Sequence, residues 1–178
     1  MDPSHDSVPY QIEAGPLLLA LPQPEDCDEL VSILSESDEI ARWTTIPFPY
    51  LPEHFHEWLA RDRQSYIIRC EGRIIGVTGA EVDPATATAE LGYWLAPSAR
   101  GAGYAVTAAR AVCSLALDRG AQRIQAKVIV GNLPSSTVLD RLGFTLEGVQ
   151  RSVHPVNCGI SPERIDLQMW SLLPGELT

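Results

Sequence analysis

A glycine-rich turn between a strand-like run and a helix-like run constrains this chain most. The turn reads Arg100, Gly101, Ala102, Gly103, Tyr104, Ala105, and it separates the apolar run 91–95 from a helix-like run over 106–117. Glycines at such a junction let backbone N–H groups approach a ligand without interference from a Cβ atom. The same N–H groups open a helix, whose first turn has unpaired donors and a positive dipole end. The turn therefore predicts a site for phosphate or diphosphate, although an ordinary tight connection fits it too.

Two other phosphate-binding patterns do not fit the turn. A dinucleotide fingerprint requires a third glycine, and Val106 stands in that place. A Walker-type loop requires Gly-Lys-Ser or Gly-Lys-Thr, which does not follow here. The rest of the chain has to decide which ligand the turn binds.

A second block of residues follows the turn. It consists of Asn132-Leu133-Pro134-Ser135, then Val138, then the run 140–144, which reads DRLGF. Together with the R-x-x-G-x-A spacing and the run 90–95, this block resembles the acyl-CoA signature of the GNAT superfamily of N-acetyltransferases. The RimJ/RimL branch, which includes ribosomal-protein N-terminal acetyltransferases, is the most similar. The resemblance covers about residues 87–173 and is only general before them.

The resemblance implies acetyl-CoA as the cofactor and no metal. It also implies a mostly antiparallel, centrally splayed sheet, with the pantetheine arm lying in the splay and bonded to the backbone of the strand that carries Trp94. A backbone N–H near Leu95 and Ala96 is then the expected donor to the oxyanion. The residues expected to bind the cofactor are Trp94, Leu95, Ala96, Arg100, Gly101, Ala102, Gly103, Tyr104, Ala105, Asn132 and Ser135.

The order of predicted elements indicates the same α+β class, with helices layered on a mixed sheet. Predicted strands cover 16–21, 66–70, 73–81, 87–95, 124–130, 144–153 and 164–173. Predicted helices include the apolar stripe of 27–34, a short helix through 40–43, and helices around 55–59, over 106–117 and over 135–142. Gly120 suits the position just after the 106–117 helix. We expect one domain over 1–178, with residues 1–9 flexible.

Ser135 is the candidate general acid. In the RimJ/RimL branch a serine at this place lies near the thioester sulfur, where it would protonate or hydrogen-bond to the leaving thiolate. Many other GNAT enzymes use a tyrosine on the same helix, and this chain has none between Asn132 and Phe144. From its position beside Pro134, Ser135 also fits a purely structural role as the helix N-cap. Asn132 fits either cofactor binding or capping of the turn after the strand.

Two residues are candidates for the general base. The RimJ/RimL branch implies an acidic side chain ten residues beyond Phe144, and the residue there is His154. A histidine departs from that pattern, but its ordinary pKa near 6.5 suits proton removal at neutral pH. Glu90 is the second candidate, acting through water. Each also fits a structural role, His154 as a surface or packing residue and Glu90 as a hydrogen-bonded strand carboxylate.

Aromatic residues in the first third of the chain are candidates for the acceptor pocket. Trp43 and Tyr50 flank the proline-rich loop 47–50, and binding functions are often found on loops. We expect these two to bind substrate. Trp58 lies at helical spacing from its apolar neighbours and favours core packing.

Charge excludes one class of partner. The 178 residues include 13 Lys and Arg against 23 Asp and Glu, a net charge of −10. Nucleic-acid backbones require clustered cations, so we expect no nucleic-acid partner. The acidic balance fits attraction of cationic amines, and equally a shell that keeps the protein soluble.

The apolar runs and the cysteines predict neither export nor a metal centre. No run approaches the roughly 20 apolar residues of a membrane span, and the run 17–21 is too short for a signal core. We therefore expect no membrane partner and a cytoplasmic location. The four cysteines form no C-x-x-C pair, so zinc ligation is not expected, and Cys27 and Cys113 fall on apolar helix stripes.

Four hypotheses for function follow from the sequence. The first is acetylation of a peptide or protein N-terminal α-amine, which needs little help from a base because its pKa is near 8. The second is acetylation of a small amine such as an antibiotic, a polyamine or a metabolite. The third is a non-catalytic acyl-CoA-binding module, and the fourth is an interaction protein without CoA. The sequence leaves open whether the protein is a monomer or a homodimer.

Overall fold

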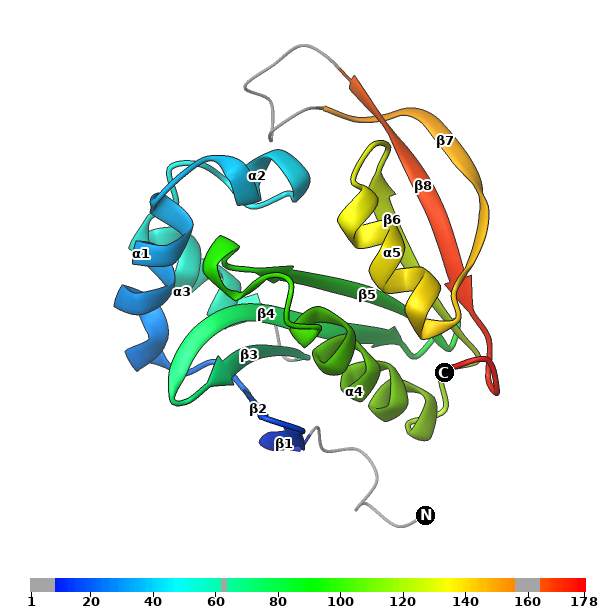
Figure 1. Ribbon diagram of the computed structural model, residues 1–178, viewed down its shortest axis with the longest axis horizontal. Helices are drawn as coiled ribbons and strands as arrows, with labels where there is room; N and C mark the ends of the chain where they lie inside the picture. Colours follow the sequence, from blue (N-terminus) through cyan, green and yellow to red (C-terminus); the bar gives the residue numbers. More distant parts are fainter. Residues whose placement is uncertain (1–8, 62–63, 156–163) are drawn as a thin grey trace.

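The strands form a single eight-stranded sheet in the order β1-β2-β3-β4-β5-β6-β8-β7 (Figure 1). The computed structural model describes residues 9–61, 64–155 and 164–178, so most of the segment 1–9 expected to be flexible lies outside the described residues. The strands are β1 Gln11–Ala14, β2 Leu17–Ala20, β3 Ser65–Cys70, β4 Arg73–Asp83, β5 Thr88–Leu95, β6 Arg123–Ile129, β7 Thr145–Pro155 and β8 Arg164–Leu172. The helices are α1 Cys27–Ser35, α2 Glu39–Trp43, α3 Pro52–Arg61, α4 Tyr104–Asp118 and α5 Leu133–Leu142.

The predicted α+β class and the element order are confirmed, with differences at a few boundaries. The sequence missed β1, because its alternation is only four residues long and its apolar side, Ile12 and Ala14, is half-buried against the larger core. Helix α4 begins at Tyr104 instead of residue 106, and α5 begins at Leu133 instead of residue 135. Helix α4 begins directly after Gly103 and helix α5 directly after Asn132. The periodicity of apolar residues does not mark these first helical residues.

Two glycines in left-handed conformations end the last two helices. Gly120, with a φ of 92°, follows α4 at the predicted position. Gly143, with a φ of 91°, follows α5, and a Cβ atom there would come within 2.2 Å of the Glu176 carbonyl oxygen. Only glycine satisfies both the backbone conformation and the close approach at residue 143.

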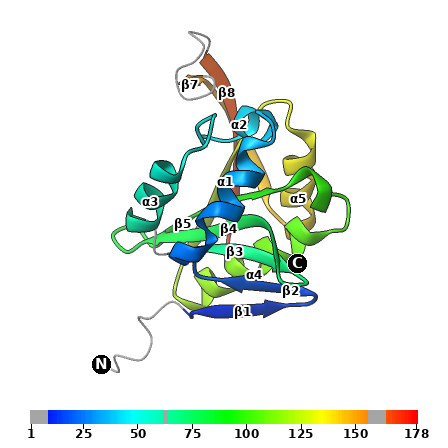
Figure 2. The same cartoon turned by 90° about the vertical axis from the view of Figure 1, so that its left-hand side faces the viewer.

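Helices cover the two faces of the sheet in separate groups (Figures 1 and 2). The alternation along β3 shows the division, because Tyr66 and Ile68 join the core beneath α4 whereas Ile67 joins the core beneath α1 and α3. Successive side chains on a strand point to opposite faces. The sheet is therefore a wall between a larger core and a smaller one.

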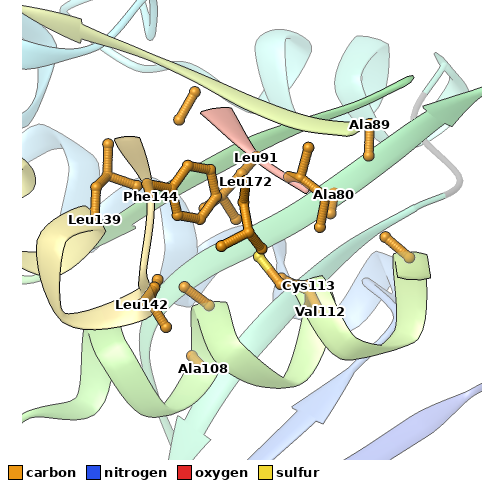
Figure 3. Close-up of a cluster of buried hydrophobic side chains, with 14 of the residues drawn as sticks. Ala80, Ala89, Leu91, Ala108, Val112, Cys113, Leu139, Leu142, Phe144 and Leu172 are labelled. Atoms are coloured by element: carbon orange, nitrogen blue, oxygen red, sulfur yellow. The ribbon is translucent and has the colours of Figure 1, made fainter. Parts of the chain in front are cut away.

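The larger core joins the two halves of the sheet. Figure 3 shows Leu91 of β5, Cys113 of α4, Leu139 of α5 and Leu172 of β8 gathered around Phe144. Each of these side chains is at most 5% exposed. Cys113 is a small core residue, as the helix stripe predicted, and Cys27 is buried in the smaller core.

The sheet opens at its centre. Strands β5 and β6 run parallel and pair only from Thr88–Arg123 to Glu90–Gln125, although both strands continue beyond that point. The other pairs of neighbouring strands in the described residues are antiparallel. This divergence is the predicted central splay, and it leaves a length of each strand without a neighbour on one side.

Candidate active site

The splayed part of β5 presents backbone groups to the opening between the strands. The N–H of Ala96 donates to the Ile75 carbonyl at 2.9 Å, so this residue faces β4. Backbone groups alternate between the two neighbours of a strand. Those of Tyr93 and Leu95 therefore point away from β4 into the opening, beyond the last β5–β6 pair. The expectation that the Ala96 N–H donates to the oxyanion is thus corrected, because β4 already uses it, and the Leu95 N–H is the remaining candidate.

The glycine-rich turn has the conformation of an anion site. Gly101 and Gly103 have φ angles of 86° and 81°, and Gly103 is the N-cap of α4. The first hydrogen bond of the helix runs from the Thr107 N–H to the Gly103 carbonyl at 3.1 Å, so the N–H groups of residues 104–106 precede the helical ladder. No side chain in the described residues caps this end of α4. Its exposed donors and dipole favour a bound anion.

The backbone and side chain of Arg100 bond to other parts of the protein and not to a ligand. Its backbone N–H donates to the Pro97 carbonyl at 3.3 Å, and its guanidinium donates to the Leu95 carbonyl at 3.2 and 3.3 Å. The guanidinium also forms an ion pair with Glu39 of α2. Of the predicted phosphate donors at 100–105, the Arg100 N–H is therefore excluded, and the N–H of residue 106, which was not predicted, joins them; Arg100 links the turn to β5 and α2.

Asn132 is the N-cap of α5. Its side-chain oxygen accepts from the Ser135 N–H at 3.2 Å. The alternative that Ser135 itself caps the helix is corrected. Ser135 lies three residues after the N-cap, and its backbone N–H donates the capping hydrogen bond to Asn132. The Ser135 hydroxyl is thus not needed to begin the helix.

Tyr93 is a site residue that the sequence reasoning missed. It reaches across the opening from β5, and its hydroxyl donates to the Ser135 carbonyl at 3.1 Å. Burial raises the pKa of Tyr93 to about 12, and a hydrogen bond with the Ser135 side chain, separate from the bond to the Ser135 carbonyl, opposes part of that rise. Nothing in the sequence indicated this contact, because Tyr93 belongs to β5 and comes close to α5 only when the chain is folded.

A cavity of about 670 Å³ is lined by residues of the smaller core beneath α1 and α3, such as Leu34 and Trp94, and extends into the opening between β5 and β6, where Tyr93 and Val128 line it. Ser135 and Asn132 line it, together with Trp43 and Tyr50. Trp43 is 42% exposed, whereas Tyr50 is 6% exposed and packs in the smaller core. The predicted substrate residues are therefore brought to one cavity, with Trp43 at the accessible side and Tyr50 as part of the supporting wall.

Charged groups at the cavity are largely paired. The Lys127 ammonium lies 2.8 Å from the Glu90 carboxylate, which also accepts from the Gln125 amide at 3.1 Å. Glu90 is thus held by two side chains of β6, as its structural alternative predicted, and it still lines the cavity. His154 pairs through its backbone with Ile165, which also lines the cavity, whereas the His154 side chain lies outside the described residues.

Neither a metal centre nor a membrane helix is found in the part of the chain that the structure describes. No three His, Cys, Asp or Glu side chains gather there in a way that could hold a metal ion. None of its helices has the length and apolar character that a membrane crossing requires.

Comparison with known families decides the class of protein. A model of the acetyltransferase (GNAT) domain matches residues 17–145. The chain belongs to the GNAT acetyltransferase family. The resemblance read from the two sequence blocks is confirmed, and so is the expectation that the protein is an acetyltransferase.

Relatives of this GNAT protein include ribosomal-protein acetyltransferases. The Bacillus subtilis (strain 168) protein named "Putative ribosomal N-acetyltransferase YdaF" is 26% identical over 173 residues, which cover 90% of this chain and 92% of that one. The RimL ribosomal L7/L12 alpha-N-protein acetyltransferase superposes with a TM-score of 0.80 at 22% identity, over 92% of this chain and 93% of that chain. The microcin C7 self-immunity acetyltransferase MccE superposes with a TM-score of 0.79 at 23% identity, over 93% of this chain and 97% of that chain.

Removal of the Tyr93 hydroxyl tests the bridge across the opening. Burial raises the pKa of Tyr50, Tyr66 and Tyr93 to about 12, whereas an unfolded tyrosine titrates near 10. Between about pH 10 and 12 the unfolded chain loses protons that the folded GNAT protein keeps, so the free energy of unfolding falls as pH rises. Tyr93→Phe should make this fall shallower and cost about 1 kcal/mol at pH 7. Urea unfolding from pH 7 to 11 measures both effects, and an unchanged pH slope would contradict the burial argument.

Proposed function

We propose that this acetyltransferase moves the acetyl group of acetyl-CoA to a primary amine, and that the amine is the N-terminal α-amine of a peptide or protein. One observation carries the proposal. The unpaired backbone edge of β5 leads, through the 3-10 turn Pro97–Ala99, to a glycine-rich turn whose N–H groups suit a diphosphate, so a single extended ligand can use both. MccE and RimL, which share the fold, have been solved with acetyl-CoA and with CoA.

The described residues fit such a cofactor. The segment 101–106 holds the diphosphate through N–H groups, and the positive φ angles of Gly101 and Gly103 keep Cβ atoms out of the way. Backbone groups of Tyr93 hold the pantetheine amides as a missing strand would, whereas the Leu95 carbonyl already accepts from the Arg100 guanidinium. The Leu95 N–H is the donor to the negative charge that develops on the carbonyl oxygen.

Acetyl transfer from this site is a direct displacement. Acetyl-CoA supplies a thioester, whose carbonyl carbon bonds to the amine nitrogen as the carbon–sulfur bond breaks. Ser135 donates a hydrogen bond to the departing sulfur, or passes its hydroxyl proton to the sulfur as it takes one from water; the thiolate needs only a weak acid because a thiol pKa is about 8.5. The amine proton leaves through Glu90 and water or through His154. The site contributes mainly by positioning the two reactants.

The choice of an α-amine rests on relatives and on charge. YdaF and RimL carry names that refer to ribosomal proteins or their α-amino groups. An α-amine is partly neutral at cellular pH, which suits a site whose carboxylate Glu90 is already paired with Lys127. A small amine is the second candidate acceptor, because the structure of MccE, which shares the fold, contains the small molecule AMP as well as acetyl-CoA.

Glycine substitution in the turn tests cofactor binding. Gly103→Ala places a Cβ atom on the anion-facing turn and should weaken acetyl-CoA binding at least tenfold, about 1.4 kcal/mol, in titration calorimetry. Gly120→Ala is a matched control, because Gly120 has a similar φ of 92°, an equally open Cβ position, and lies at the other end of α4. Equal affinity in the two variants would remove the diphosphate assignment.

Removal of the Ser135 hydroxyl tests the acid. Ser135→Ala should lower kcat about tenfold or more, with acetyl-CoA affinity unchanged, because the backbone holds the cofactor. Ser136→Ala is the control, since the Ser136 hydroxyl bonds to Gln168 of β8 at 2.9 Å and is committed to the fold. Thiol release measured with peptide acceptors gives kcat. A variant as fast as wild type would defeat the role of Ser135.

The pH dependence of turnover separates the two candidate bases. The wild-type enzyme should show a rising limb of kcat/KM near neutral pH that reports loss of one proton. We expect the limb to disappear in His154→Ala and to remain in Glu90→Gln if the imidazole removes the proton, and the reverse if the carboxylate does. A limb that persists in both variants would leave only selection of the neutral amine, and neither residue would be a base.

A further inference from the structure

Gly92 is an exposed glycine in the middle of a central strand. It lies in β5 directly opposite Gly79 of β4, on the sheet face that lines the cavity. A glycine inside a strand weakens that strand, and it usually marks a bulge, a close backbone contact or the approach of a ligand. These explanations differ in what surrounds the Cβ position.

The first two explanations fail at Gly92. The register between β4 and β5 is continuous from Gly76–Leu95 to Asp83–Thr88, so Gly92 is not in a bulge. The φ angle of Gly92 is not positive, and a Cβ atom added there would meet nothing within 4 Å. Gly79 is the contrast, because a Cβ atom there would lie 2.9 Å from the Gln64 carbonyl oxygen and 3.0 Å from the Ser65 Cα. Packing explains Gly79 and does not explain Gly92.

The pair Gly79–Gly92 leaves a gap between larger side chains in the part of the sheet that lines the cavity. On the same face, the pair Val77–Trp94 lies before it and the pair Glu81–Glu90 lies after it. These two pairs are four residues apart on each strand, roughly 13 Å at the rise of a β-strand. Between them neither β4 nor β5 carries a side chain on this face, Ser65 of β3 lies beside Gly79, and Trp43 lines the same cavity from α2.

We propose that Gly92 is a specificity-determining residue, which leaves room for the acceptor group next to the reacting amine. For an N-terminal α-amine, that group is the first residue of the acceptor peptide. The inference rests on the proposed function and adds a size limit to it. The occupant is the acceptor and not the cofactor, because Gly92 faces the side of α1 and α3 whereas the glycine turn opens α4 on the other side.

Substitution at Gly92 should narrow the acceptor range without harming the fold. Gly92→Val fills open space on a strand that favours β-branched residues, so its Tm should not fall below that of wild type. Its kcat/KM should fall at least tenfold for peptides that begin with a large residue, and less for peptides that begin with glycine or alanine. Gly92→Ala should show the same order with smaller effects. Acetyl-CoA affinity from calorimetry should stay within twofold of wild type.

Three results would overturn the inference. These are equal losses for all first residues, unchanged kcat/KM in Gly92→Val, and weaker acetyl-CoA binding in step with the loss of activity. Gly79→Ala serves as the packing control and should lower Tm, because its Cβ atom has no space. The wild-type enzyme separates the two proposals, since failure to acetylate any peptide or small amine would reject the proposed function before any variant is compared.

Discussion

The early end of pairing between β5 and β6 is the constraint on which the rest of the structure depends. Parallel pairing stops at Glu90–Gln125, and beyond it each strand has backbone groups that no neighbouring strand satisfies. Buried backbone groups without partners are costly, so such an edge needs water, a side chain or a ligand. The opening is therefore both a weakness of the sheet and the place where an extended ligand can replace a strand.

Contacts on both sides of α5 keep the opening at one width. Tyr93 bonds the first turn of α5 to β5, and Ser136 bonds the same turn to Gln168 of β8. Below them, Phe144 and Leu139 pack in the core that spans both halves of the sheet. Well-packed cores resist deformation. The distance between the divergent strands is thus fixed, and the Ser135 backbone, bonded to Tyr93 and Asn132, is held where Ser135 lines the cavity.

The two faces of the opening have different chemistry. On the α4 side, the turn around Gly101 and Gly103 offers only backbone donors and the positive end of a helix. On the other side, the cavity combines the gap at Gly92 with the paired charges of Glu90 and Lys127. An anionic cofactor and an amine acceptor can therefore approach the opening from opposite faces without competing for the same groups.

Local patterns in the sequence predicted most strands, the larger helices and the turn at residues 100–105, because periodicity and glycine placement act over a few neighbouring residues. The short strand β1 was missed, because its alternation includes only two apolar residues, Ile12 and Ala14. Only the tertiary structure decided that the N–H of Ala96 is used by Ile75, that Arg100 pairs with Glu39, and that Tyr93 reaches Ser135. Each of these depends on strand register or on a contact between elements distant in the chain, which no short stretch of residues encodes by itself.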